Sequence, residues 1–160
     1  MSGPVPTPIR AVFDCNIFLQ ALGNTAGPAG LCLQAVWDGR VALVVSPAIL
    51  DELSDVASRP ETLRKFPRLS SRYYRLLQQL EVTATFVKNV PSIFAYARDP
   101  RDAPYVDLAI ATGAYLLVSR DKDLLDLMND TNTEGRQLRI QYPTFQVLTP
   151  PQFLQTLSTT

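Results

Sequence analysis

The sequence predicts an α/β protein built as a three-layer α/β/α sandwich, with a central parallel sheet of about five strands. Short apolar runs alternate with helical segments along the whole chain, as they do in proteins with parallel sheets. A length of 160 residues fits one domain. We therefore expect a single domain over residues 9–158, preceded by a flexible, proline-rich tail over residues 1–8.

Five segments have the composition of buried strands. The first, residues 9–13, is an apolar run without alternation, which favours a strand covered on both faces. The others are predicted at residues 42–45, 82–87, 115–118 and 145–148. Because open α/β sheets bind ligands at the carboxyl ends of their strands, the residues that follow these segments are candidates for a site.

Helices are predicted between the strands from their capping signals. Ser46 and Pro47 form an N-cap and first-turn pair for a helix that runs to about residue 58. Pro104 fits only the first turn of its helix, and Gly113 ends that helix. Further helices are expected at 31–37, 59–80 and 150–157, and loops at 23–30, 89–96 and 129–139.

The residue types restrict the possible chemistry. Fifteen basic residues balance fifteen acidic ones, so no global field attracts the chain to nucleic acid or to a membrane. The absence of histidine excludes Ser-His and Cys-His nucleophiles, histidine acid–base catalysis and histidine-bound zinc. The two cysteines form neither a CxxC pair nor a disulfide framework, and no signal peptide or membrane-spanning run is present. We expect a cytoplasmic protein that uses carboxylates.

Four acidic residues are expected at one edge of the sheet. Asp14 follows the first strand, Asp121 follows the fourth, and Asp102 lies at the start of a helix. Glu52 lies on the apolar side of its helix, where an unpartnered carboxylate is costly. Carboxylates that approach one another need a cation between them, and oxygen ligands suit Mg²⁺ or Mn²⁺.

The third acid has two rivals, Asp99 and Asp107. Asp102 is preferred because it lies at the helix start and because of its spacing to Gly113. Asp107 is about 140° round the helix from Asp102, at 100° per residue. Taken singly, each acid of the four could be a helix cap or a buried ion-pair partner, so only their joint occurrence indicates a site.

A basic stretch, residues 59–75, holds six of the fifteen basic residues among apolar and aromatic ones. An amphipathic helix pair with a solvated basic face is the commoner cause of this composition. A groove that follows a phosphate backbone, with Tyr73 and Tyr74 stacked on bases, also fits it. Both interpretations stay open at this point.

Five motifs follow one another in a recognisable order. They are an apolar strand with Asp-x-Asn, then Ser-Pro-x-x-x-x-Glu, Asp-Pro-x-Asp, Ser-x-Asp-x-Asp-Leu-Leu and Thr-Pro-x-x-Phe-Leu. In this order they resemble the PIN domain nucleases over residues 10–157. More narrowly, the chain is similar to the VapC-like toxins of bacterial toxin-antitoxin pairs. One such motif alone would be weak, whereas five in the right order are specific.

The resemblance implies a metal-dependent endoribonuclease that uses Mg²⁺ or Mn²⁺ to activate a water against the RNA backbone and leaves a 5′ phosphate. The catalytic and metal-binding residues would be Asp14, Glu52, Asp102 and Asp121, with Asp123 as a further metal ligand. Asn16 and Ser119 would support these acids. The flanking phosphates would contact Arg98, Arg101, Arg120 and Lys122.

The resemblance also implies partners, and the chain departs from the family pattern at some positions. RNA would be the substrate, a small antitoxin the protein partner, and a homodimer the assembly. Cys15 stands where the family usually has Thr or Ser, and Ser119 stands where Thr is more frequent. The segment 129–142 is long for the group, so contacts made there cannot be transferred.

Other function classes fit less well. Haloacid-dehalogenase-like phosphatases need a second Asp two positions after the first, where this chain has Asn16. Receiver domains need a pair of adjacent early acids, which is missing. The main alternative is a non-catalytic PIN module that binds RNA or a protein partner. The presence of all four acids ranks this alternative second.

Overall fold

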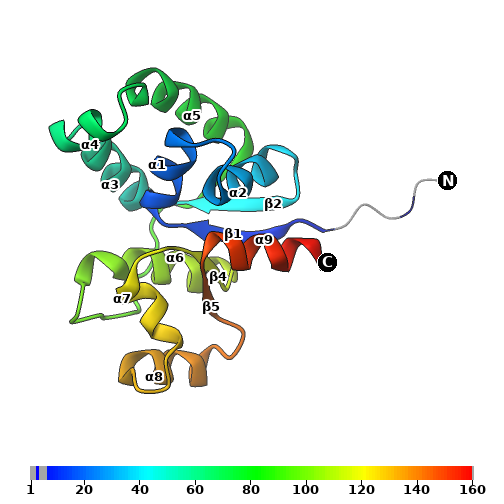
Figure 1. Ribbon diagram of the computed structural model, residues 1–160. Coiled ribbons are helices and arrows are strands. Elements are labelled where there is room, and N and C mark those ends of the chain that lie inside the picture. Colours follow the sequence, from blue (N-terminus) through cyan, green and yellow to red (C-terminus); the bar gives the residue numbers. More distant parts are fainter. Residues whose placement is uncertain (1–2, 4–6, 160) are drawn as a thin grey trace.

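The computed structural model describes residue 3 and residues 7–159. Most of the tail predicted over residues 1–8 therefore lies outside the described residues. Within the described part, five parallel strands form one sheet in the order β3-β2-β1-β4-β5, and helices lie around it (Figure 1). This arrangement confirms the predicted three-layer α/β/α class.

The strands are short, and the central ones are buried. They are β1 (Ile9–Phe13), β2 (Val41–Val45), β3 (Thr85–Phe86), β4 (Leu116–Val118) and β5 (Gln146–Leu148). The middle strand β1 pairs with β2, where Ile9 lies opposite Val41, and with β4, where Phe13 lies opposite Val118. Because both faces of the sheet are covered, β1 has no regular alternation of apolar and polar residues.

Helices cover the sheet on both sides. They are α1 (Cys15–Gly23), α2 (Pro28–Trp37), α3 (Pro47–Ala57), α4 (Pro60–Lys65), α5 (Leu69–Thr83), α6 (Ala103–Thr112), α7 (Lys122–Leu125), α8 (Thr133–Gln141) and α9 (Pro150–Ser158), with 3₁₀ turns η1 (Pro100–Asp102) and η2 (Asp126–Met128). Helix α2 packs between α1 and α9, whereas α6 packs against β1, β2 and β4 (Figure 1). No helix in the described part of the chain is long and apolar enough to cross a membrane.

Helix ends follow the local signals of the sequence. At the start of α3 the Ser46 hydroxyl accepts the N–H of Ile49 at 3.4 Å. At the start of α9, Thr149 and Gln152 form a reciprocal capping box. Gly113 ends α6 with a φ of 65°, a left-handed conformation that glycine adopts at little cost. The predicted starts of α3 and α9 and the end of α6 are confirmed.

Four local predictions are wrong. The helix expected at 59–80 is two helices, α4 and α5, separated at residues 66–68. The loop expected at 23–30 is shorter, because α2 begins at Pro28 and a first turn does not need the missing N–H. The strand expected at 82–87 is only Thr85–Phe86, because α5 continues to Thr83. Much of the loop expected at 129–139 is the helix α8.

Helix α8 is built on two features that look like loop signals in the sequence. The side chain of Asn132 caps the helix by accepting the N–H of Gly135 at 2.8 Å. A Cβ at Gly135 would lie 2.1 Å from the carbonyl oxygen of Leu127. Glycine at this position therefore reflects the close approach of α8 to η2, not a break in the helix.

Candidate metal centre at the carboxyl edge of the sheet

Asp14 lies where the two central strands end. Its N–H donates to the carbonyl of Val118 at 3.0 Å, which extends the β1–β4 pairing by one residue. Its carboxylate is 4% exposed and accepts a hydrogen bond from the Ser119 hydroxyl at 2.7 Å. The same hydroxyl accepts the N–H of Asp121 at 2.9 Å. One buried serine therefore links Asp14 to the turn that carries Asp121.

The surroundings of Asp14 disfavour its charged form. Burial raises the pKa of its carboxyl group, and the negative charges of Glu52 and Asp121 raise it further. The hydrogen bonds from Ser119 and from the backbone N–H of Asn16 act in the opposite direction. Asn16 itself is exposed. A cation at this edge would compensate the charges that raise the pKa.

Glu52 is held by a buried tyrosine of α6. Tyr105 is 1% exposed, donates its hydroxyl to Glu52 Oε2 at 2.6 Å, and accepts the N–H of Cys15 at 3.3 Å. Burial raises the pKa of the Tyr105 hydroxyl, so it stays protonated as a donor. Burial also raises the pKa of the Cys15 thiol, which therefore stays neutral. Sequence reasoning missed Tyr105, because a buried aromatic residue on an apolar helix has the pattern of a core residue.

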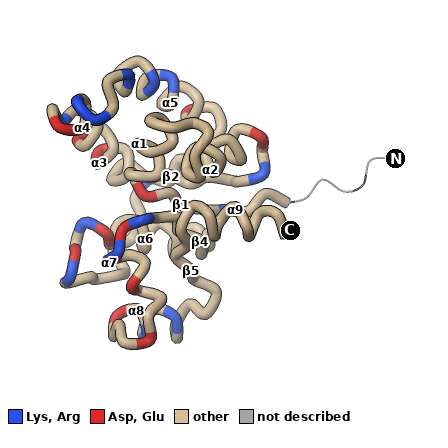
Figure 2. The backbone as a smooth tube through the Cα atoms, viewed as in Figure 1, with Lys and Arg blue, Asp and Glu red and all other residues tan. Residues whose placement is uncertain are grey.

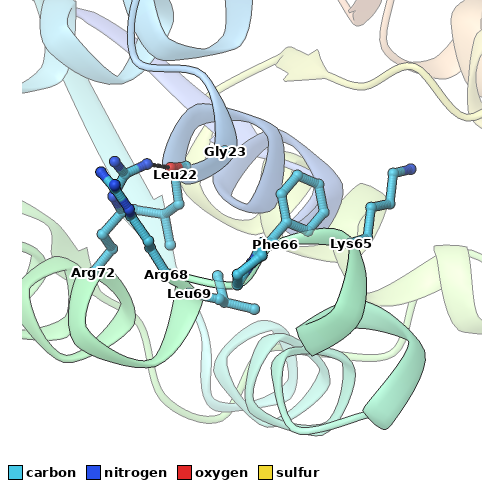
Figure 3. A pocket seen from close by; sticks show the side chains of 8 residues that line it. Leu22, Gly23, Lys65, Phe66, Arg68, Leu69 and Arg72 are labelled. Carbon is cyan, nitrogen blue, oxygen red and sulfur yellow. Dashed lines mark hydrogen bonds between the residues drawn. The ribbon is translucent and has the colours of Figure 1, made fainter.

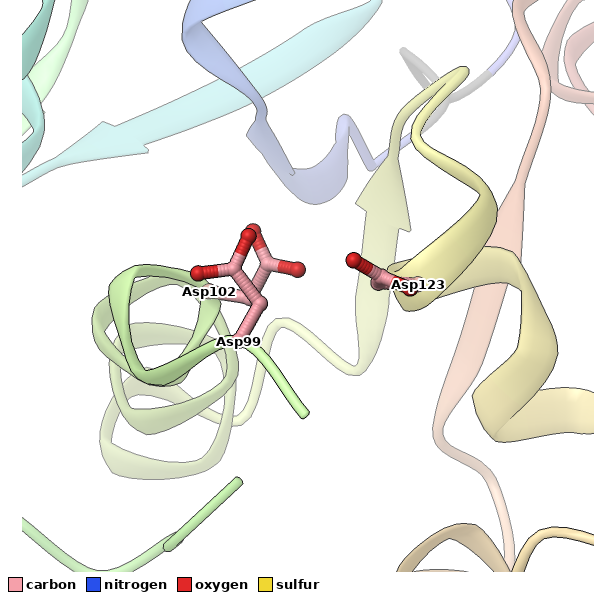
Figure 4. Close-up of side chains that lie close together, drawn as sticks. All are labelled: Asp99, Asp102 and Asp123. Atoms are coloured by element: carbon pink, nitrogen blue, oxygen red, sulfur yellow. The ribbon is translucent and has the colours of Figure 1, made fainter. Parts of the chain in front are cut away.

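Asp102 lies in a second, tighter group of carboxylates. Oxygens of Asp99, Asp102 and Asp123 all lie within 4.8 Å of one another, and Figure 4 shows Asp123 reaching from α7 toward the other two. Asp102 is 5% exposed, and its Oδ2 has no hydrogen-bond partner in the part of the chain that the structure describes. Burial raises the pKa of Asp102 to about 8, and the charges of Asp121, Asp99, Asp14 and Asp123 contribute in the same direction.

The donor set fits a hard divalent cation. Every candidate ligand offers carboxylate oxygen, the ligand type that Mg²⁺ and Mn²⁺ prefer. A buried carboxylate oxygen without a partner is costly, and a cation beside Asp102 Oδ2 would satisfy it. Asp102 connects the two groups, since the charges of Asp14 and Asp121 raise its pKa and oxygens of Asp99 and Asp123 lie within 4.8 Å of its carboxylate.

Asp99 and Asp107, the two rivals for the third position, have different surroundings. Asp99 lies beside Asp102 and caps η1 by accepting the N–H of Arg101 at 3.1 Å. Sequence reasoning treated it only as a substitute for Asp102. Asp107 lies in α6 and accepts the N–H groups of the 89–96 loop at positions 93 and 94, at 3.0 and 2.7 Å. Asp107 therefore has a structural explanation.

Two of the four basic residues expected at phosphates are already paired. Arg98 forms ion pairs with Asp123 at 2.6 Å and with Asp126 at 2.5 Å. The hydrogen bond to Asp126 raises the pKa of the Arg98 guanidinium above its ordinary value. Arg101 is paired with Asp99 at 3.3 Å.

The other two basic residues keep their charges available. Arg120 and Lys122 are exposed on either side of Asp121, and neither forms an ion pair with any residue that the structure describes. They are therefore the better candidates for contact with an anionic ligand.

Comparisons with known proteins show which family the chain resembles. The sequence profile of the PIN domain family matches residues 10–123, a span that includes Asp14, Glu52, Asp102 and Asp121. The chain is also similar to an uncharacterized protein of Methanocaldococcus jannaschii. The two are 28% identical over 147 residues, which cover 92% of this chain and 90% of that protein.

Proposed function

The chain belongs to the PIN domain family, and on that basis we propose that it is an endoribonuclease that depends on Mg²⁺ or Mn²⁺. One observation carries the proposal: the buried Asp102 lies among further carboxylates, and its Oδ2 has no partner among the residues that the structure describes. A buried carboxylate among other acids is relieved either by a proton or by a cation, and only a cation also offsets the charges of the neighbouring acids.

The acids of both groups would hold the cation: Asp14, Glu52, Asp99, Asp102, Asp121 and Asp123. A bound Mg²⁺ or Mn²⁺ supplies activation of water and neutralisation of charge on the phosphate. The protein supplies rigid placement. The Ser119 hydroxyl holds Asp14 and the Asp121 turn together, and Tyr105 holds Glu52. These hydrogen bonds fix the carboxylates before the substrate arrives, which lowers the cost of reorganisation during the reaction.

The finer assignment follows the resemblance noted in the sequence. The substrate is RNA, and the protein is the toxin of a toxin-antitoxin pair in the cytoplasm. A small antitoxin would cover the acidic edge, and the chain would act as a homodimer. A short reading frame immediately upstream that encodes a small partner protein would support this assignment.

The test is cleavage of a mixed pool of single-stranded RNA by the purified protein in Mg²⁺, in Mn²⁺ or in EDTA. Asp14→Asn controls for contaminating nuclease, since it removes one acid and leaves the packing of β1 unchanged. We expect cutting that needs metal and is lost in Asp14→Asn. If the protein binds Mn²⁺ and RNA but never cuts, it is a binding module and the proposed enzyme is wrong.

A further inference from the structure

Two adjoining pockets lie between the end of α1 and the segment that joins α4 to α5. Each has a volume of about 310 Å³. They share three lining residues, Gly23, Lys65 and Phe66. The first continues toward Arg68, as Figure 3 shows, and the second toward Arg120.

Both pockets have an excess of positive charge. Neither has an acidic residue in its lining, although acids and bases balance over the whole chain. Lys and Arg gather over α4 and α5 in Figure 2. Lys65, Arg68 and Arg120 form no ion pair with any described residue, whereas Arg72 donates to the carbonyl of Leu22 at the end of α1. Three cations are therefore available to a polyanion.

Phe66 separates the two pockets. Its partly buried ring lines both of them, and one ring edge rests against Gly23, where a Cβ would lie 2.3 Å from Cε1 of the ring. The ammonium group of Lys65 lies 5.6 Å from the ring centroid. An aromatic ring beside an unpaired cation is the combination that binds a base and its phosphate in single-stranded nucleic acid.

Arg120 connects this surface to the acidic site. It lies between Ser119 and Asp121 in the sequence, and it lines the same pocket as Lys65. A nucleic-acid strand bound at the acidic residues therefore passes the cations first and the aromatic ring next. No acidic residue lines either pocket.

We propose that single-stranded RNA runs from the acidic edge over Arg120 and Lys65 to Arg68, with one base stacked on Phe66. This inference rests on the proposed ribonuclease function and adds the path and the strandedness of its substrate. Duplex RNA is excluded as the preferred ligand because its bases are already paired and stacked, and cannot reach the ring.

In this path the stacking residue is Phe66, and not Tyr73 or Tyr74 as the basic stretch of the sequence suggested. The two rings lie 6.3 Å apart and contact each other. Neither tyrosine lines the two pockets, whereas Phe66 lines both. Phe66 takes the stacking role because it lies where the cations converge.

The test is the affinity for a short, labelled single-stranded RNA, measured by fluorescence anisotropy in EDTA so that no cleavage occurs. Lys65→Ala should weaken binding roughly tenfold and reduce the slope of log affinity against log salt by about 0.7, the value for one phosphate contact with a single strand. Arg64→Ala is the matched control, since it removes the same charge from the same helix but lines neither pocket. It should leave the affinity nearly unchanged.

Stacking is tested separately. Phe66→Leu keeps an apolar side chain but removes the ring, and should weaken binding about tenfold. Phe66→Trp keeps an aromatic ring and should bind about as tightly as the wild type. Circular dichroism checks that each variant is folded. In cleavage assays with Mn²⁺, Lys65→Ala and Phe66→Leu should raise KM and leave kcat unchanged.

The path is overturned if both variants bind as tightly as the wild type, or if duplex RNA competes as well as the single strand. Failure of the nuclease itself has a different signature: no cleavage under any metal, with the same pattern of binding defects. Cleavage by the wild type together with unchanged binding in the variants would keep the enzyme and reject the path.

Discussion

Two aspartates that are close in the sequence are equally buried but have different hydrogen-bond partners. Asp102, at the end of η1, and Asp107, in the middle of α6, are both 5% exposed. Asp107 Oδ1 accepts the N–H groups of Ile93 and Phe94. Asp102 Oδ2 has no partner among the described residues, and the Asp102 carboxylate lies close to those of Asp99 and Asp123. Burial alone therefore does not distinguish the two aspartates, whereas an unpaired oxygen together with neighbouring carboxylates does.

Asp107 and Asp102 also affect the stability of the fold differently. Hydrogen bonds to the Asp107 carboxylate stabilise the fold because they join a loop to a helix and satisfy two backbone donors. Asp102 gains nothing comparable from its neighbours, and burial with nearby negative charge raises its pKa to about 8. Without a cation, Asp102 therefore opposes folding in its charged form.

The largest effect is expected on cleavage. Asp102→Asn should reduce the rate of RNA cleavage in Mn²⁺ by about a thousandfold, because several kcal/mol of transition-state stabilisation depend on the cation. Asp107→Asn should retain most of the activity, since its amide oxygen can still accept the two N–H groups. The measurement is the initial rate of RNA cleavage by each folded variant. Equal losses in the two variants would remove the distinction between the two aspartates.

The second effect is on the free energy of unfolding. Asp107→Ala should lower it by about 3 kcal/mol in urea denaturation with EDTA, because two part-buried N–H groups lose a charged acceptor. Asp107→Asn should cost clearly less. Asp102→Asn should leave stability unchanged or raise it, because it removes a repelled carboxylate. An Asp102→Asn protein as unstable as Asp107→Ala would contradict the account.

The third effect is on the pH dependence of stability in EDTA. Between the ordinary pKa of 3.8 and the raised pKa of about 8, Asp102 holds a proton in the folded chain that the unfolded chain releases. The folded state then binds more protons, so stability should fall as the pH rises through this window. Melting temperatures should show a shallower fall in Asp102→Asn. Parallel curves for the two proteins would show that Asp102 does not titrate in this way.

The smallest effect is expected at Arg98, which holds two acids in exposed ion pairs. Arg98→Gln should change stability little, because such pairs are screened by solvent. It should tighten Mn²⁺ binding, since it removes a positive charge that competes with the cation for Asp123. Calorimetric titration with Mn²⁺ measures this, and weaker binding in the variant would mean that Arg98 instead positions Asp123 for the metal.

The sequence predicted the parts of the fold that depend on local signals. Burial of β1 on both faces, the Ser46 cap and the Gly113 stop each follow from the residues present. Prediction failed where tertiary contacts override local preference. Val82 and Thr83 favour a strand, yet they continue α5, whose Leu76 and Leu80 are buried in the core. The same applies to Gly135, whose role depends on a close approach that only the fold shows.

The candidate site, like the fold, could be predicted only in part. Asp14 and Asp121 could be placed at one edge because Asp14 directly follows one recognisable strand and Asp121 lies three residues after the end of another. The approach of Asp99 to Asp123, the bridge made by Tyr105 and the position of Phe66 depend on how segments distant in the sequence meet. No local pattern contains that information.

The most direct test of a cation site centred on Asp102 is anomalous diffraction from a crystal of this protein soaked in Mn²⁺. The account predicts a manganese ion in direct contact with Asp102 Oδ2 and with at least one other acid of the two groups, and none at Asp107. An ion that lies elsewhere, with Asp102 Oδ2 bonded to protein or water, would contradict it.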